Sequence, residues 1–338
     1  LGRKHVELAL LRLGNALQQG DVLIGRPDGG AFRDESLGDG PSTSNRVSPG
    51  DLDRIIGIAT DLGLQPGTFG DAGADLEDKR LLAKLDWNIN DSHRASLSFQ
   101  RTKESQPIVQ GNNATSVGLS SFWYNKDSDT KNTVLHLFSD WTDTFSTEAR
   151  VSPSSLSQVR TTESQQPQVV IRLNEDGTGP TVNLGEDQFS HYNVLDVKSW
   201  NAFAAGTWNL DSHAIKVGFD YQQNEIYNLF GRTQFGAYTF WGIENFAQGI
   251  YNQFDLYQPA EGLTIDDVAA EWTYKQWGLF LQDTWQVNDA LSVQYGLRVD
   301  IPKTGDKPLY NAEFEQAFGV RNDSTIDNQL LFQPRVSF

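Results

Sequence analysis

Apolar and polar residues alternate along the segment 277–302, "WGLFLQDTWQVNDALSVQYGLRVDIP". Apolar side chains fill most odd positions on both sides of a central Asn-Asp pair, and the even positions are mostly polar or small. A period of two is typical of a β-strand with two unlike faces, and Asn-Asp suits the turn of a hairpin. The segment therefore predicts two long antiparallel strands joined by a tight turn.

Three further segments repeat this pattern, and each places a Trp just before a short polar turn. They are 84–100, 134–151 and 204–221. With the opening segment, they supply the tryptophans Trp87, Trp141, Trp208 and Trp285. The copies are too irregularly spaced for a solenoid or a propeller. We interpret them as four hairpins of one antiparallel sheet.

The connections between the predicted strands are unequal. Turns within hairpins are a few residues long, whereas the expected loops between hairpins are 102–132, 152–198, 223–275 and 303–329. Short turns at one end and long loops at the other are typical of outer-membrane barrels, as are aromatic girdles at both interfaces. The predicted strands, at about 9–11 residues, have the length that a tilted strand needs to cross the hydrocarbon layer. We expect an all-β fold in which residues 80–338 form part of an antiparallel transmembrane β-barrel with about eight or nine strands.

One charged residue departs from this pattern. Asp283 lies on the apolar parity of its strand, two residues from Trp285. Either it lies near the membrane interface, where a charge costs less, or a bulge shifts the parity there.

Residues 1–79 are expected to be an irregular N-terminal segment with a short helix near 50–63. Ser48 suits the N-cap, Pro49 the first helical position and Gly63 the C-terminal end. Inside one long loop, "VVIRLNEDGTGPTVNLG" (169–185) predicts a small hairpin. Its oxygen-rich turn lacks the spacing of an EF-hand loop, which favours a plain turn over a calcium site.

Composition narrows the possible partners. The net charge of −17 disfavours nucleic acid, and the absence of Cys excludes disulfides and thiolate metal sites. A mean hydropathy of −0.48 suits a soluble protein, but a barrel with a polar lumen gives an equally weak signal. Since the chain also has no Met, we expect a fragment that is truncated at both ends.

We expect no enzyme activity, no cofactor and no metal site. Asp-Ser-His occurs at 91–93 and again at 211–213, but consecutive residues cannot converge as a catalytic triad does. Both copies occupy turn positions, where Asp and Ser bond to their own backbone. The five histidines are dispersed, without a short-range ligand pair.

Three sets of residues are candidates for function. The four turn-proximal tryptophans form either a membrane-interface girdle or core aromatics beneath the turns. The polar face of the strands forms either a lumen wall facing a plug or a solvated face with ion pairs. The glycines on this face either leave space for a plug or ease the curvature of the sheet; they are Gly218, Gly278 and Gly296. The charged residues of this face are Lys84, Arg94, Glu148, Arg150, Lys216, Asp220, Arg298 and Asp300.

The third set is a group of aromatic residues in the long segment 223–275. They are candidates for ligand contact, because exposed aromatic rings stack on sugars, peptides or flat chelates; alternatively they pack the loop. They are Phe235, Tyr238, Phe240, Trp241, Phe246 and Tyr251, with Phe254 and Tyr257 nearby.

The segment "YKQWGLFLQDTWQVNDALSVQYGLRVDIP" (274–302) resembles a barrel hairpin of the TonB-dependent outer-membrane receptors. In that family a hydrophobic-QD-x-W strand, a polar turn and a YGLR-x-D strand recur. The segments "KLDWNINDSHRASLSFQ", "FGAYTFWGIENFAQGI" and "LLFQPRVSF" are similar to the Oar-like branch. The resemblance covers roughly residues 50–338.

The resemblance implies a receptor in the outer membrane of a Gram-negative bacterium that takes up a scarce solute or peptide with energy passed on by TonB. It implies an N-terminal plug within a barrel of about 22 strands, and neither the plug nor a TonB box is identifiable in this sequence. The expected partners are outer-membrane lipid and lipopolysaccharide, the protein's own plug, TonB and the solute. Two alternatives remain open: a soluble extracellular β-protein, such as an adhesin or carbohydrate-binding module, and a passive porin.

Overall fold

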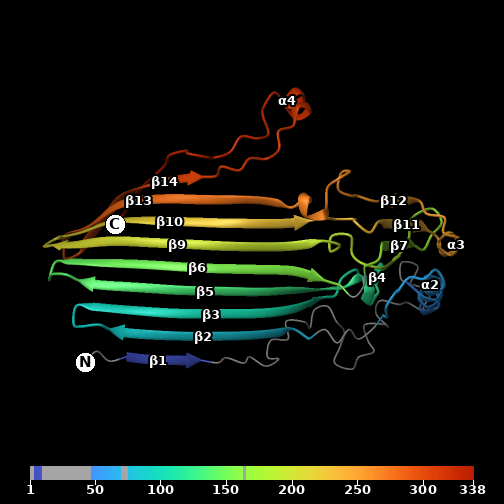
Figure 1. Ribbon diagram of the computed structural model, residues 1–338, viewed down its shortest axis with the longest axis horizontal. Helices are drawn as coiled ribbons and strands as arrows, with labels where there is room; N and C mark the ends of the chain where they lie inside the picture. The colour runs from blue at the N-terminus through green and yellow to red at the C-terminus, as the bar shows by residue number, and fades with distance from the viewer. Residues whose placement is uncertain (1–3, 10–46, 70–74, 163–164) are drawn as a thin grey trace.

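The computed structural model describes residues 4–9, 47–69, 75–162 and 165–338. Ten strands form one antiparallel sheet, here called the wall, in which each strand pairs with the wall strands that precede and follow it in the chain (Figure 1). They are β1 (Lys4–Ala9), β2 (Glu77–Asn88), β3 (His93–Ile108), β5 (Tyr124–Asp140), β6 (Phe145–Thr161), β9 (Asn193–Leu210), β10 (His213–Phe230), β13 (Ala270–Asn288), β14 (Leu291–Lys303) and β15 (Leu331–Ser337). The four predicted hairpins and the antiparallel sheet are confirmed.

The wall strands are longer than predicted. The six strands β3, β5, β6, β9, β10 and β13 contain 16 to 19 residues each. They continue beyond the apolar stretch into a region where the outward positions are occupied by charged residues. Because the prediction relied on apolar alternation, it placed the strand ends too early. The loops are correspondingly shorter than expected and run over 109–123, 162–192, 231–269 and 304–330. The wall also has ten strands rather than eight or nine, because β1 pairs with β2.

A second sheet forms at the end of the wall where the long loops lie (Figure 1). Its five strands have the order β12-β11-β7-β8-β4, and the pairs β11–β7 and β4–β8 are parallel because their strands come from different loops. They are β4 (Ser116–Gly118), β7 (Gln168–Arg172), β8 (Thr181–Leu184), β11 (Ala237–Trp241) and β12 (Gln253–Asp255). The predicted hairpin at 169–185 is observed as β7–β8.

Two helices cover this small sheet, and we call the assembly the distal unit. They are α2 (Pro49–Asp61) and α3 (Ile243–Ala247). Ser48 caps α2, because its Oγ accepts a hydrogen bond from the Asp51 N–H at 3.1 Å. Leu52 and Ile55 of α2 pack against side chains of the small sheet. The buried core is Val47, Leu52, Ile55, Ala59, Val117, Leu119, Val169, Ile171, Val182, Leu184, Phe240, Ile243 and Phe246.

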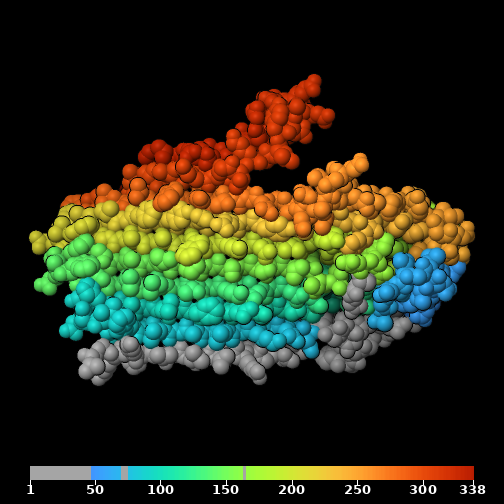
Figure 2. Space-filling model, in the orientation of Figure 1, coloured from blue at the N-terminus to red at the C-terminus, as the bar shows by residue number. Residues whose placement is uncertain are grey.

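The remaining short elements lie in the loops. They are η1 (Ser120–Phe122), η2 (Ile265–Val268) and α4 (Ala312–Phe318). The loop with α4 extends away from the wall (Figures 1 and 2). Across the described ranges, no helix is both long and apolar enough to cross a membrane. The helix expected near 50–63 is observed as α2. Most of the irregular stretch expected within 1–47 lies outside the described residues. The domain boundary at 79 stays a prediction.

Candidate functional site

The two faces of the wall differ in crowding as well as in polarity. The register stays continuous along the central strand pairs, so the alternation of the sequence is preserved along whole strands. Leu279 and Leu281 on the apolar face are 56% and 53% exposed, whereas Gly278 and Asp300 on the polar face are buried. The apolar face is therefore the outward face, and the charged face is turned inward.

The four predicted girdle tryptophans are all exposed beside the short turns. Sequence reasoning missed a second set, Trp200 and Trp277, which are also exposed on the outward face. Each lies eight residues before Trp208 or Trp285 on the same strand, so parity and spacing could have revealed it. Eight residues extend about 26 Å along a strand, close to the roughly 25 Å height of the apolar band of such barrels. The girdle role of these residues stays a prediction.

Brominated lipid tests that role. In vesicles of brominated phospholipid, we expect replacement of Trp200, Trp208, Trp277 and Trp285 by Phe to remove most of the quenchable Trp fluorescence. The matched control replaces Trp123, Trp241 and Trp272, which lie at the loop end of the structure. Equal loss of quenching in both variants would show that the first set does not face lipid.

Asp283 lies on the outward face without a shift of parity. It pairs with Ile215 and Tyr295, and the register of β13 with β14 shifts only later, between Gln286 and Asn288. The residue is 8% exposed, and its carboxylate accepts a hydrogen bond from the Tyr295 hydroxyl at 2.6 Å, while His213 Nδ1 lies 2.7 Å from the same oxygen. These partners offset the cost of a charge near the interface. Of the two alternatives, the bulge is wrong for Asp283, and the interfacial position stays a prediction.

An ion-pair network spans three strands of the inward face. Arg298 on β14 reaches across β13 to a bidentate pair with Asp220 on β10, and it also pairs with Asp300 at 2.6 Å. Gly278 lies between them in register, and a Cβ there would lie 2.2 Å from the Arg298 guanidinium. Gly278 therefore provides the space for the network, a more specific role than easing curvature.

A second glycine, Gly218, leaves space for the ring of Phe280 in the same way. A Cβ at Gly218 would lie 2.2 Å from the Phe280 ring, which crosses β10 and stacks near Phe203 with centroids 6.0 Å apart. Sequence reasoning missed both rings, because apolar residues on a polar face carry no periodic signal.

The other inward candidates lie on the predicted face. Arg150 and Lys216 both lie over the Phe203 ring, 5.5 and 5.6 Å from its centroid. Arg94 lies over Phe138 at 5.0 Å. Glu148 lies 2.8 Å from His136 and 3.6 Å from Lys216, and the exposed Lys84 pairs with Asp86 on its own strand. This face thus presents both charges and aromatic rings, and its contact with a plug stays a prediction.

The six aromatic ligand candidates divide by burial. Phe240 and Phe246 are 6% and 1% exposed and pack edge to face in the core of the distal unit, so the ligand-contact expectation is corrected for these two. Phe235 is half-buried against His191. Trp241 is exposed at its edge and packs on Gly177 in the β7–β8 turn.

The remaining candidates, Tyr238 and Tyr251, form an aromatic surface with Phe254. Tyr238 stacks on Phe254 with centroids 4.5 Å apart and meets Tyr251 edge to face at 5.6 Å. Tyr251 and Phe254 are exposed, and we call the three rings the aromatic platform. Gly236 permits this packing, because its φ of 91° suits glycine and a Cβ there would lie 2.8 Å from the Phe254 ring.

Glu186, Asp187 and His191 are buried in the loop that leads to β9. Burial raises the pKa of Glu186 to about 7. Burial also lowers the pKa of His191, whose Nδ1 accepts a hydrogen bond from the Phe235 N–H at 3.1 Å, which leaves Nε2–H to donate to the Glu186 carbonyl. A neutral His191 therefore holds the start of the aromatic segment.

This burial predicts a pH dependence of the distal unit. Because the folded pKa of Glu186 exceeds its ordinary value of 4.5, its stabilising effect is complete below pH 4.5 and is lost as pH rises through about 7. We expect Glu186→Gln to match wild type at pH 5 and to be more stable at pH 8 by on the order of 2–3 kcal/mol. Hydrogen exchange of β7 and β8 at both pH values measures this. His191 acts in the opposite sense, but it is present in both proteins and cancels in their difference.

The repeated Asp-Ser-His segments are turns. Asn90 closes the first turn, since its Oδ1 accepts hydrogen bonds from the Ser92 and His93 N–H groups. In the second copy, the polar partner of His213 is Asp283 on a neighbouring strand. The side-chain acceptor in the first turn is thus Asn90 rather than the predicted Asp91.

A sheet with an exposed apolar outward face, tryptophans at both edges of that face and a charged inward face is the wall of a membrane β-barrel. The family model described as "Outer membrane beta barrel domain" matches residues 63–336. The chain therefore belongs to this family, and the protein is located in the outer membrane. This location excludes the soluble β-protein alternative.

Several solved structures are similar to this chain at low sequence identity. The ferric-catecholate import receptor Fiu from Escherichia coli K12, closed form, is 12% identical with a TM-score of 0.47, covering 80% of this chain and 41% of that one. The copper transporter OprC is 12% identical with a TM-score of 0.44, covering 77% and 34%. The FrpB iron transporter from Neisseria meningitidis, F5-1 variant apoprotein, is 13% identical with a TM-score of 0.42, covering 80% and 34%. The chain spans less than half the length of each of these proteins. Comparison with curated proteins gave no match.

Proposed function

We propose that this chain forms part of the barrel of an energy-coupled outer-membrane receptor, which captures a scarce solute on its distal unit and is not an enzyme. The observation that carries the proposal is the aromatic platform. Three mutually packed rings, two of them exposed, lie on the unit that stands at the long-loop end of the wall. Packed rings are positioned in advance, so they stack on a ligand at little entropic cost.

The motifs of the sequence support coupling to TonB. The QDTW and YGLRVD segments are the two strands β13 and β14, and they carry the inward network of Arg298. In the proposed receptor this face contacts a plug, and TonB pulls on the plug to open a path. We infer membership of the Oar-like branch from the segments at 84–100, 235–250 and 330–338.

Ligand binding tests the platform. Four probes represent the open ligand classes: a ferric catecholate, cobalamin, a maltodextrin and a tripeptide. We expect one of them to bind the purified protein, and Tyr251→Ala with Phe254→Ala to weaken that binding roughly tenfold or more, since each aromatic contact contributes about 0.5–1.5 kcal/mol. The control is Tyr310→Ala, an exposed ring in the α4 loop. Unchanged affinity in the double variant would rule out the platform as the binding surface.

Energy coupling needs a separate experiment. Uptake of the bound probe by cells is expected to stop when TonB is deleted. Uptake that continues at the same rate without TonB would instead support the passive porin.

A further inference from the structure

Two inward rows of the wall form a level without charge. One row runs in register from β6 to β13 and the next from β5 to β13, and both consist of Asn, Gln and Ser with a single Tyr. Within the described residues, neither row contains a charged side chain. We call the amides of these rows the amide band: Asn132, Asn201, Gln222, Asn224 and Gln276.

The levels on either side of the amide band are different. Toward the turns, the next inward row contains Arg150 and Asp220 of the charged inward face. Toward the loops, the next inward row is apolar: Leu156, Val197, Ile226 and Trp272. An uncharged polar level is therefore bordered by charges on one side and by apolar side chains on the other.

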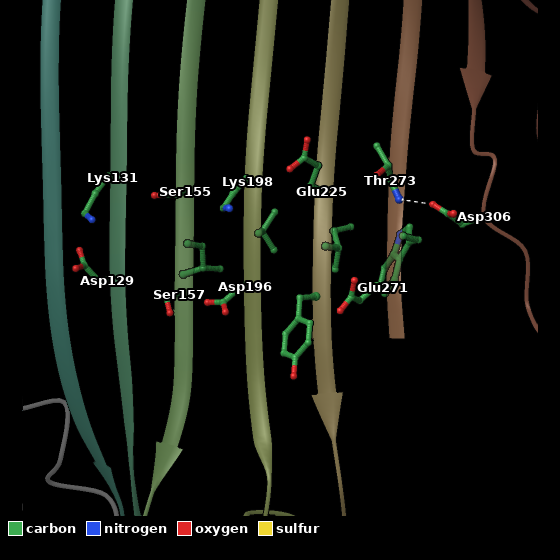
Figure 3. Close-up of a pocket in the computed structure, with 15 residues that line it drawn as sticks. Asp129, Lys131, Ser155, Ser157, Asp196, Lys198, Glu225, Glu271, Thr273 and Asp306 are labelled. Atoms are coloured by element: carbon green, nitrogen blue, oxygen red, sulfur yellow. Dashed lines mark hydrogen bonds between the residues drawn. The ribbon is translucent and has the colours of Figure 1, made fainter. Parts of the chain in front are cut away.

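The absence of charge is a property of the inward face and not of this part of the chain. Lys131, Lys198 and Glu225 are each adjacent in sequence to a residue of the row that begins on β5. Their side chains point to the opposite face and line a concavity on the outside of the wall (Figure 3). That concavity contains both signs of charge, whereas the inward positions beside it contain neither.

The amide band lies on the loop side of the wall, opposite the outer limit of the apolar face. Asn201 directly follows Trp200, and Gln276 directly precedes Trp277, so the band is level with the second set of tryptophans. Because strand neighbours point to opposite faces, these amides point inward where the tryptophans point outward. A solute that passes from the distal unit toward the turns therefore meets the apolar row and the amide band before the charged rows.

Side-chain hydrogen bonds orient part of the amide band and leave donors for a ligand. The Tyr274 hydroxyl donates to Gln276 Oε1 at 2.6 Å, and the Ser199 hydroxyl donates to Asn224 Oδ1 at 2.7 Å. Both amides therefore keep an NH2 group that can donate to a bound solute. Within the part of the chain that the structure describes, the remaining amides of the band form no side-chain hydrogen bond.

We propose that the amide band binds a neutral oligosaccharide inside the wall, with sugar hydroxyls on the amides and sugar rings against the apolar row that contains Trp272. A sugar hydroxyl both donates and accepts a hydrogen bond, and so do the amides and the serine hydroxyls of the two rows. The C–H face of a sugar ring packs on an indole, which offers a large apolar surface. The inference rests on the proposed receptor function and names its substrate class.

The absence of charge disfavours two of the other solute classes. An anionic ferric chelate requires cations around it, and the amide band provides none. A peptide carries a charged group at each end, for which the two rows contain no partner. From β6 to β13 the band extends about 14 Å at a strand spacing of about 4.8 Å, which suits a chain of several sugar rings rather than one ring.

An array of neutral and acidic oligosaccharides tests the inference on the purified protein, followed by titration of the glycan that binds. We expect a neutral oligosaccharide to bind. Asn201→Leu with Gln222→Met keeps the shape of both side chains but removes their donors and acceptors, and we expect it to weaken binding roughly 10- to 100-fold. Gln222→Met alone is expected to weaken binding roughly 3- to 10-fold, and it replaces the double variant if that variant does not fold.

The matched control is Asn209→Leu with Gln294→Met, which makes the same two changes on the inward face near the turns. It is expected to bind like wild type, and heat-modified gel mobility confirms that each variant is folded. Binding of acidic glycans only, no binding of any glycan, or equal loss in the control pair would each overturn the inference. Unchanged affinity in Gln222→Met would also overturn it and would assign the amide band to contact with the plug.

The proposed function can stand when this inference fails. If a ferric catecholate, cobalamin or a tripeptide binds instead and its binding depends on Tyr251 and Phe254, the aromatic platform remains the binding surface and the oligosaccharide is ruled out. If no probe of either experiment binds, both the proposed function and this inference fail.

Discussion

Replacement of Arg298 by Ala is expected to lower the free energy of unfolding by about 3–5 kcal/mol, because it leaves two crowded carboxylates without their cation. Within the described residues, Arg298 is the only basic residue that forms an ion pair with Asp220 or Asp300, and its side chain is 18% exposed. Mutual repulsion of the two carboxylates adds to the cost. Urea unfolding in lipid vesicles, followed by Trp fluorescence, measures the change.

Two variants separate this effect from simple truncation of an arginine. Arg321→Ala removes an exposed pair with Asp323 in the α4 loop and should cause little change. Arg298→Met combined with Asp220→Asn and Asp300→Asn removes all three charges and should recover much of the lost stability. An Arg298→Ala protein as stable as Arg321→Ala would mean that the network contributes nothing to the wall.

Phe246→Ala is expected to unfold the distal unit while the wall stays intact. Its side chain is 1% exposed and packs on Phe240, and loss of a buried Phe costs about 3–5 kcal/mol in a core. Among the described residues, the core of this unit contains thirteen buried hydrophobic side chains, so such a cavity removes a large share of its stability. Hydrogen exchange should show α2, β7 and β8 losing protection while β9 and β10 keep theirs.

Ile250→Ala is the matched control, since Ile250 is an exposed apolar residue three positions beyond α3. It should leave exchange in the distal unit unchanged. Loss of protection in β9 and β10 with Phe246→Ala would mean that wall and distal unit unfold as one body.

The wall could be predicted because its signal is local. Each hairpin shows its two faces through alternation and its turn through two to four polar residues, as in "WNLDSHAIKV" around 211–212. The position of Asp283 followed from the same parity, although its partners did not, because Tyr295 and His213 come from two neighbouring strands. The predicted strand ends were wrong, because charged outward residues such as Lys198 and Asp196 end the apolar alternation while the backbone pairing continues.

The distal unit could be predicted only in pieces. The Ser48–Pro49 start of α2 and the β7–β8 hairpin carry local signals. Their association does not, because the parallel pairs β4–β8 and β7–β11 join segments that are about 65 residues apart or more. Therefore Phe240 and Phe246 looked like surface aromatics in the sequence, while the pairing of three loops, together with the packing of α2, buried them.

The parallel pairing of the small sheet also bears on how the protein can be detected at the cell surface. Its strands come from three different loops, and α2 comes from a fourth segment, so the surface of the distal unit does not exist in any single peptide. An antibody raised against the folded unit would recognise only chains whose wall strands have already paired in order. Such an antibody would count completed barrels on living cells, and antibodies raised against linear loop peptides would not.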